Sequence, residues 1–501
     1  MKKIFFSLLV LFILPAVSVF AQEEAESTSE TIFVIHSFEF IVHGMTRPFA
    51  LINKAELRVG EEITGHSNLE RFVRDKRQLL MNERVLESVR VEYTVGHVRE
   101  DGKYPVDLIF HIKDTWNIIA IPRPQYSSNS GLDITIKARD YNFLGTMSPL
   151  RFDIGYQRDL DGRDFYTLML DSDIPFRLFD LNWCLNFDHD YTYRPDMSQP
   201  HYYRNVTGLS VEIPFYFTTP TIGFDVHFIV NEENSDIDKP LYGDFQDGLY
   251  ISTRPFISWK IPTGLNIDSY GELTYTPRIS ATFNHQVSSW TLQDHRKGPF
   301  AAFSHSLGFG RINWLENFQQ GFSVNASNSF SYDFNSRDNI DPLTTSISFT
   351  GIGHFVFTDF LGFSTRLMYR HWFNSYNDKA GDVLRGVLDR DIQADFMISL
   401  NLDLPVRVLR IRPSEWFNNS KLRVFNFDLH MSPVIDMAIY QYSEAQNSFG
   451  KENFLISGGL ETIIFPDFFR SLYLRISVGW DFSDISTKTP MEIFIGTELH
   501  F

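Results

Sequence analysis

The residues that could do chemistry are scattered through this chain and form no recognisable catalytic set. The segment Gly208–Glu212 (GLSVE) approaches the G-x-S-x-G motif of serine hydrolases, but a glutamate stands where the second glycine is needed. There is no H-E-x-x-H motif, the 15 histidines occur singly, and Cys184 is the only cysteine. We therefore predict no catalytic residue, no metal site and no cofactor, and a protein that is not an enzyme.

The acidic residues belong to another pattern. Asp153, Asp188, Asp333 and Glu498 lie on the polar sides of segments in which apolar and polar residues alternate. On one face of a strand such carboxylates line an interior more often than they transfer protons. We expect them to set the electrostatics of a water-filled lumen.

The elements that position these residues follow a two-residue period from about residue 116 to the end. Clear examples are residues 150–157, 181–188, 322–334 and 491–501, where every second side chain is apolar. This period gathers the apolar groups on one face of a strand and Ser, Asn, Asp, Glu and Gly on the other. In a soluble sandwich the apolar face would meet a second sheet, and in a transmembrane barrel it would meet lipid.

Three features favour the membrane barrel. The chain begins with a secretory signal, 15% of its 501 residues are aromatic (48 Phe, 21 Tyr), and polar loops such as 232–247 and 374–382 separate the alternating segments. Past residue 21 no apolar run approaches the ~18 residues of a membrane helix. At ~24 residues per strand with its loop, we predict an antiparallel barrel of about 16 strands over residues 116–501, its last strand ending at Phe501.

The first thirty residues predict a signal peptide followed by a linker. Lys2-Lys3, the apolar stretch 4–20 and Ala21 describe a signal peptide over residues 1–21. Residues 22–30 are an acidic linker without large apolar groups. The net charge of −17 makes nucleic acid a poor partner.

Residues 31–115 change pattern several times within a short span, which is typical of a small α+β domain. We expect a strand over 32–42, a helix over 47–56, a second helix starting near Ser67, and strands over 86–95 and 106–112. This β-α-α-β-β order is large enough to fold as one compact domain.

Several short segments, taken together in order, resemble one family. In chain order they are Phe38-Glu39-Phe40, Arg58–Glu61, Asp140–Thr146, Leu384–Val387 and Val434–Asp436. The first two are similar to a POTRA (polypeptide-transport-associated) domain. The others resemble motifs in the barrel of the bacterial outer-membrane assembly and translocation superfamily, of BamA and TamA type. This resemblance implies one POTRA-like domain over 31–115 and a barrel over 116–501.

The resemblance also implies site residues. Leu384, Arg385, Gly386 and Val387 would form the tip of a long loop folded into the barrel, and Asp436 would be the partner of Arg385. A guanidinium can hold a carboxylate through two parallel hydrogen bonds, which would fix the loop inside the lumen. The alternative is a solvated loop arginine.

Some residues depart from the family pattern. Val387 stands where an aromatic residue is usual, and Ala438 where a glycine is. At the chain end, Gly496, Leu499 and Phe501 look like the C-terminal signal read by the barrel-assembly machinery, although the first position is Phe494 instead of a polar residue.

The implied function is the insertion, assembly or translocation of other polypeptides at the bacterial outer membrane. The implied partners are unfolded outer-membrane protein clients, outer-membrane lipid, and a periplasmic or membrane accessory protein at the POTRA-like domain, which would lie in the periplasm. The alternative is an outer-membrane pore or a surface-exposed binding protein with the same architecture.

Overall fold

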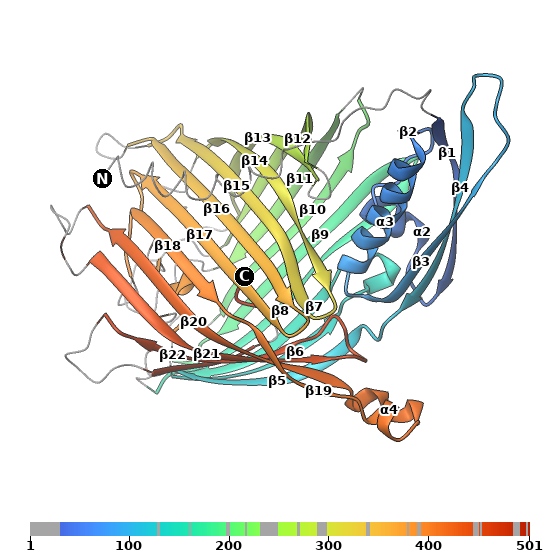
Figure 1. Ribbon diagram of the computed structural model, residues 1–501. Helices are drawn as coiled ribbons and strands as arrows, with labels where there is room; N and C mark the ends of the chain where they lie inside the picture. The colour runs from blue at the N-terminus through green and yellow to red at the C-terminus, as the bar shows by residue number, and fades with distance from the viewer. Residues whose placement is uncertain are drawn as a thin grey trace. The chain divides into compact units, whose positions relative to one another are not determined.

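A computed structural model gives the protein as a mainly antiparallel β structure (Figure 1). It describes residues 31–501 except 128–130, 160–161, 197–200, 216–217, 231–248, 268–270, 288–297, 337–340, 378–379, 388–391, 444–449, 451–452, 484–490 and 497–498. The predicted signal peptide (1–21), the linker (22–30) and Glu498 lie outside the described residues.

The first elements form a four-stranded sheet with two helices. They are β1 (Ile32–His43), α2 (Pro48–Lys54), β2 (Glu62–Thr64), α3 (His66–Asn82), β3 (Leu86–Val95) and β4 (Tyr104–Asp114), and the sheet order is β2-β1-β4-β3. The order matches the sequence prediction except for β2, a three-residue strand too short to give a period. Within the described residues, no helix is long and apolar enough to cross a membrane.

The chain divides into two compact units. One contains residues 31–39, 58–74 and 92–108 of the described chain, and the other contains 40–57, 75–91 and 109–501. The boundary therefore runs through β1, α3, β3 and β4 and does not fall at one point near residue 115. The first unit buries Phe33, Ile35, Leu69, Val106 and Leu108.

The second unit is dominated by a strand order that closes on itself, with β23 beside β5. Its strands are β5 (Ile118–Ser127), β6 (Gly131–Asp140), β7 (Leu150–Arg158), β8 (Asp164–Leu178), β9 (Leu181–Tyr193), β10 (His201–Glu212), β11 (Thr219–Val230), β12 (Leu249–Ile267), β13 (Gly271–Gln286), β14 (Phe300–Leu315), β15 (Phe318–Asp333), β16 (Leu343–Thr358), β17 (Leu361–Phe373), β18 (Phe396–Asp403), β19 (Val406–Ile411), β20 (Phe427–Gln441), β21 (Phe454–Pro466), β22 (Leu474–Asp481) and β23 (Met491–Gly496). Short helices are η1 (Phe143–Gly145), η4 (Ala380–Val383), α4 (Pro413–Trp416) and η5 (Ser420–Phe425).

The predicted strand number of sixteen is wrong. The described chain has nineteen barrel strands, of which β18 and β19 share one position between β17 and β20, separated by Leu404 and Pro405. The estimate allowed too many residues per strand because several turns are very short. Phe179 and Asp180, both at positive φ, alone join β8 to β9.

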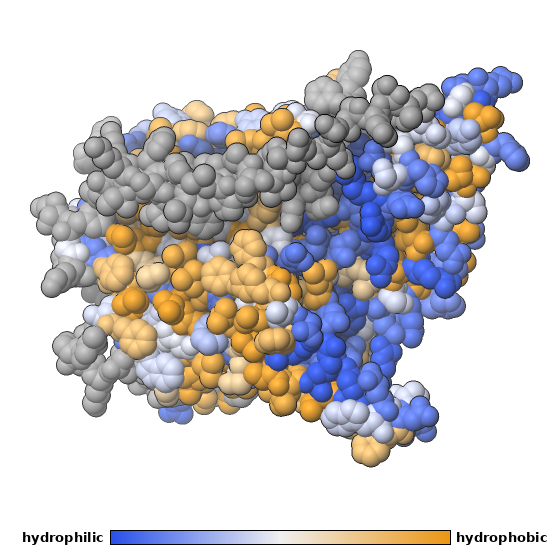
Figure 2. Space-filling view, viewed as in Figure 1, coloured by the Kyte–Doolittle hydropathy of each residue, from blue (hydrophilic) through white to orange (hydrophobic). Residues whose placement is uncertain are grey.

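Along the barrel strands, apolar side chains are exposed and neighbouring polar side chains are buried, which is the reverse of a soluble protein. On β7, Ile154 is 47% exposed while the neighbouring Asp153 is 7% exposed, and on β20 the corresponding values are 49% for Ile435 and 1% for Asp436. Figure 2 shows hydrophobic side chains over much of the outer surface of the strands on the visible face. The apolar face is therefore the outside of the closed sheet, which excludes the sandwich alternative.

The last strand is shorter than predicted. β23 ends at Gly496, so Leu499 and Phe501 do not continue the alternation on its outer face. In the described residues β23 makes one register pair with β5, Ile493 opposite Tyr126. By comparison, β22 and β23 are paired along the whole length of β23, from Arg475 opposite Gly496 to Trp480 opposite Met491. The junction of β23 with β5, called the seam below, thus has fewer register pairs in the described residues than the junction of β22 with β23.

Candidate functional site

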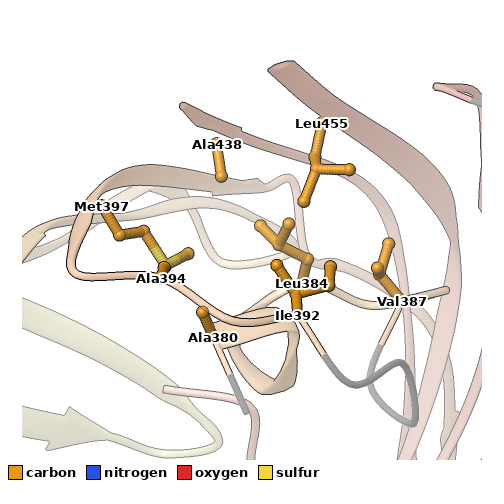
Figure 3. Close-up of a cluster of buried hydrophobic side chains, with 8 residues drawn as sticks. All are labelled: Ala380, Leu384, Val387, Ile392, Ala394, Met397, Ala438 and Leu455. Atoms are coloured by element: carbon orange, nitrogen blue, oxygen red, sulfur yellow. The ribbon is translucent and has the colours of Figure 1, made fainter. Parts of the chain in front are cut away.

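The candidate site is a segment between β17 and β18 that lies against the inner face of the barrel wall. It consists of η4 and the following residues Leu384–Val387. Its apolar side chains pack with residues of β18, β20 and β21 (Figure 3). This apolar cluster contains Ala380, Leu384, Val387, Ile392, Ala394, Met397, Ala438 and Leu455. Because Leu384 and Val387 are fully buried, the segment is held by packing as well as by charge.

Arg385 is the centre of the site and is 1% exposed. Its Nε donates to Oδ2 of Asp436 at 2.9 Å and its Nη2 donates to Oδ1 at 2.6 Å, which is the two-bond arrangement of guanidinium and carboxylate. The backbone N–H of Arg385 also donates to Oδ2 of Asp436, at 2.8 Å. The structure therefore brings Arg385 and Asp436 together and excludes a solvated loop arginine.

Two further carboxylates, which the sequence analysis missed, complete the contacts of Arg385. Its Nη2 donates to Oδ1 of Asp403 at 2.5 Å, and Oε2 of Glu461 lies 3.6 Å from its Nη1. Strand register explains the meeting: Asp403 stands opposite Val434, two residues before Asp436, and Glu461 opposite Ser432. All three carboxylates thus fall on one face of β18, β20 and β21.

Two more arginines balance this charge. Nη1 of Arg475 lies 3.3 Å from Oε2 of Glu461, and Arg366 donates from Nε to the side-chain oxygen of Asn401 at 3.0 Å and from Nη2 to the carbonyl of Val383 at 3.2 Å. The resulting set of three arginines and three carboxylates has no formal net charge. We call it the arginine cluster: Arg366, Arg385, Asp403, Asp436, Glu461 and Arg475.

Gly386 lets the loop approach the wall at backbone distance. Its φ is +87°, and a Cβ added there would lie 2.8 Å from the backbone nitrogen of Trp480. A Cβ added at Gly479 on β22 would in turn lie 2.6 Å from the nitrogen of Gly386. Both positions therefore need glycine, the first for its conformation and both for space.

The chain end also reaches the arginine cluster. Arg366 donates from Nη1 to the carbonyl of His500 at 3.1 Å, and its guanidinium lies 4.9 Å from the ring centre of Phe501. Leu499 lines a small cavity together with His500 and Phe501. The predicted signal residues are thus split: Gly496 ends β23, and Leu499 and Phe501 lie near the loop.

A second charged region lies on the inner faces of β6 to β10. Its ion pairs are Arg139 with Asp153, Arg151 with Asp171 at 2.7 Å, and Arg204 with Asp188 at 2.9 Å. They surround an open cavity of about 400 Å³. We call this region the open charged wall. Two of the carboxylates predicted to line a lumen, Asp153 and Asp188, are found here in ion pairs.

In the part of the chain that the structure describes, no three His, Cys, Asp or Glu side chains gather as metal ligands. The arrangement of the arginine cluster suits holding a loop, because each of its carboxylates already contacts an arginine.

Comparisons with known proteins add little to this geometry. No family model matches the sequence, and no curated protein matches it. Among solved structures, CdiB from Acinetobacter baumannii matches with a TM-score of 0.46 and 12% identity, covering 93% of this chain and 73% of that one. BamA from Haemophilus ducreyi lacking POTRA domains 1–3 matches with a TM-score of 0.37 and 13% identity (92% and 83% covered).

A structure of another kind is similar to a comparable degree. OccK2 (OpdF) from Pseudomonas aeruginosa, in complex with glucuronate, matches with a TM-score of 0.37 and 11% identity, covering 75% of this chain and 94% of that one.

Proposed function

We propose that this protein is an outer-membrane barrel that helps other polypeptides to insert into, or cross, that membrane. The membrane placement is supported by the apolar outer face and polar inner face of a closed sheet. Such a surface is stable in lipid and unstable in water. The signal peptide predicted from the sequence supports the same location.

The single observation that carries the assembly role is the seam. A strand edge with few ladder hydrogen bonds is a template for another strand, and the described residues of β23 and β5 share one register pair. A client strand could pair with that edge and leave into the bilayer once its own sheet has formed. Unfolded outer-membrane proteins are thus the proposed clients, and burial of their apolar faces in lipid would drive the step.

The α+β domain is proposed as the periplasmic part, similar to a POTRA domain. β3 ends its four-stranded sheet as an edge strand. An edge of this kind can accept an extended client or an accessory protein by strand addition. No nucleotide or metal is required by this scheme.

A second candidate function is an outer-membrane pore or binding protein. It is favoured by the open charged wall, whose cavity of about 400 Å³ is lined by several charged side chains of both signs. Such a surface could select charged solutes. The arginine cluster would then only narrow the pore.

Depletion of the protein in its native bacterium tests the proposal. We expect the amounts of other folded barrels in the outer-membrane fraction to fall, measured by quantitative mass spectrometry and by heat-modifiable gel mobility. Normal amounts of every other barrel would exclude general assembly and leave a dedicated secretion role.

Single-channel conductance of the purified protein separates assembly from the pore. A large, steady, solute-selective conductance that Arg385→Ala does not change would contradict the assembly role and support the pore. The assembly role predicts small or irregular conductance that increases when the loop is released.

A further inference from the structure

The residues beside the seam suggest how its opening is controlled, an inference that rests on the proposed function for its biological purpose. On β23, the ring of Phe494 has guanidinium groups over it from both neighbouring strands. Arg123 of β5 lies 4.8 Å from the ring centre, and Arg475 of β22 lies 4.3 Å from it. Arg123 also donates from Nε to the carbonyl of Ile495 at 2.7 Å.

These contacts hold together strands that the backbone ladder joins weakly. Each arginine over an aromatic ring is attracted by the negative face of the ring, more strongly where water is excluded. Arg475 is 5% exposed, so water is largely excluded from its contact with the ring. Side-chain contacts from Arg123 therefore replace part of the hydrogen bonding that the single register pair of the seam does not provide.

The same arginine connects the seam to the loop. Arg475 contacts Glu461 at 3.3 Å, Glu461 lies 3.6 Å from Arg385, and Arg385 is bonded to Asp436. A continuous series of contacts thus leads from β5 to the loop tip. It consists of the two arginine–ring contacts of Phe494 and the ion pairs of Glu461, Arg385 and Asp436. If the loop leaves, Glu461 loses one of its two cations, and its remaining charge will draw Arg475 away from the ring.

We propose that Phe494, held between Arg123 and Arg475, is a latch that keeps the seam closed while the Arg385 loop is in place. Release of the loop weakens the latch through Glu461 and Arg475. The sequence position is informative in itself, because Phe494 stands where the resemblance leads us to expect a polar residue, which could not make these ring contacts.

Amide hydrogen exchange of the folded full-length protein in lipid vesicles tests the latch without any client. Peptides covering β23 and β5 report how often the seam opens. We expect Phe494→Leu, which keeps an apolar side chain but removes the ring, to raise exchange there about tenfold. Phe494→Tyr keeps the ring and should match the wild type, and exchange in β14 and β15 should stay unchanged in both.

Coupling is tested by combining substitutions. Arg385→Ala alone should raise exchange at β23, but adding it to Phe494→Leu should raise it little further, since both act through one latch. Arg151→Ala, which removes an arginine from the open charged wall, is the matched control and should have no effect at the seam. Wild-type exchange in Phe494→Leu, or fully multiplicative effects in the double variant, would overturn the proposal.

A disulfide staple separates the latch from the proposed function. Cysteines replace Ile493 and Tyr126, which are register partners across the seam, in a Cys184→Ser background; directly opposed antiparallel positions are suited to a disulfide. The staple should abolish the extra exchange of Phe494→Leu. If stapled protein still inserts clients normally, the seam is not the client route, although the latch itself stands. If the staple leaves the extra exchange in place, that exchange does not come from seam opening and the latch is wrong.

Discussion

The arginine cluster and the Arg151–Asp171 pair of the open charged wall use the same kinds of side chain in different surroundings. In the cluster, Arg385 of the loop and Asp436 of the barrel wall are each 1% exposed. On the open charged wall, the side chain of Arg151 is 46% exposed and that of its partner Asp171 is 23% exposed. Burial differs from pair to pair, since Arg139 and Asp153 on the same wall are each 7% exposed, and an ion pair is expected to stabilise structure most where water is excluded.

The largest effect is expected from removing the cation of the cluster. Arg385→Ala would leave Asp403 and Asp436 buried beside each other without their shared partner, which typically costs about 3–5 kcal/mol. We expect this loss in the free energy of unfolding, measured by urea titration of the protein in micelles. A loss of less than about 1 kcal/mol would mean that water enters the cluster freely and that the two regions do not differ.

A smaller effect is expected at Gly386. Gly386→Ala meets both a positive φ and a backbone contact, whereas Gly264, at φ +78°, has nothing within 4 Å of an added Cβ. The matched control Gly264→Ala therefore carries only the conformational cost, about 1–2 kcal/mol. We expect Gly386→Ala to lose about 1–3 kcal/mol more than the control in the same titration, because the loop must move away from β22. Equal losses would show that the loop does not press against Trp480.

The smallest effect is expected on the open charged wall. Arg151→Ala should change the free energy of unfolding by about 0.2–1 kcal/mol, as for other half-exposed pairs. The change should shrink further in ~1 M salt, since the screening length there is only ~3 Å. A salt-independent loss as large as that of Arg385→Ala would place the open charged wall in the same class as the cluster.

The sequence allowed some features to be predicted because they depend on local order along the chain. The two-residue period fixed the strands and their faces, and the order of elements in residues 32–112 could be read from changes of period. The Arg385 and Asp436 contact was predicted from a family resemblance. The partners are 51 positions apart in the sequence, so no local rule would have found the contact.

Other features depend on register, which a single sequence does not reveal. Asp403, Glu461 and Gly479 reach the loop only because of how β18, β20, β21 and β22 are aligned. The strand count failed for a related reason. Turns such as Phe179-Asp180 lack the usual glycine, so their positions could not be read from the sequence.

The inside-out alternation of the barrel strands has a consequence for the protein before it folds. A strand that places its apolar groups at every second position, as on β7 and β20, never offers the bilayer a continuous apolar run. If the protein is the outer-membrane barrel proposed above, such a chain can pass through a secretion channel without being retained as a membrane helix. Its affinity for lipid would then arise only when neighbouring strands pair, after the polypeptide has reached the outer membrane.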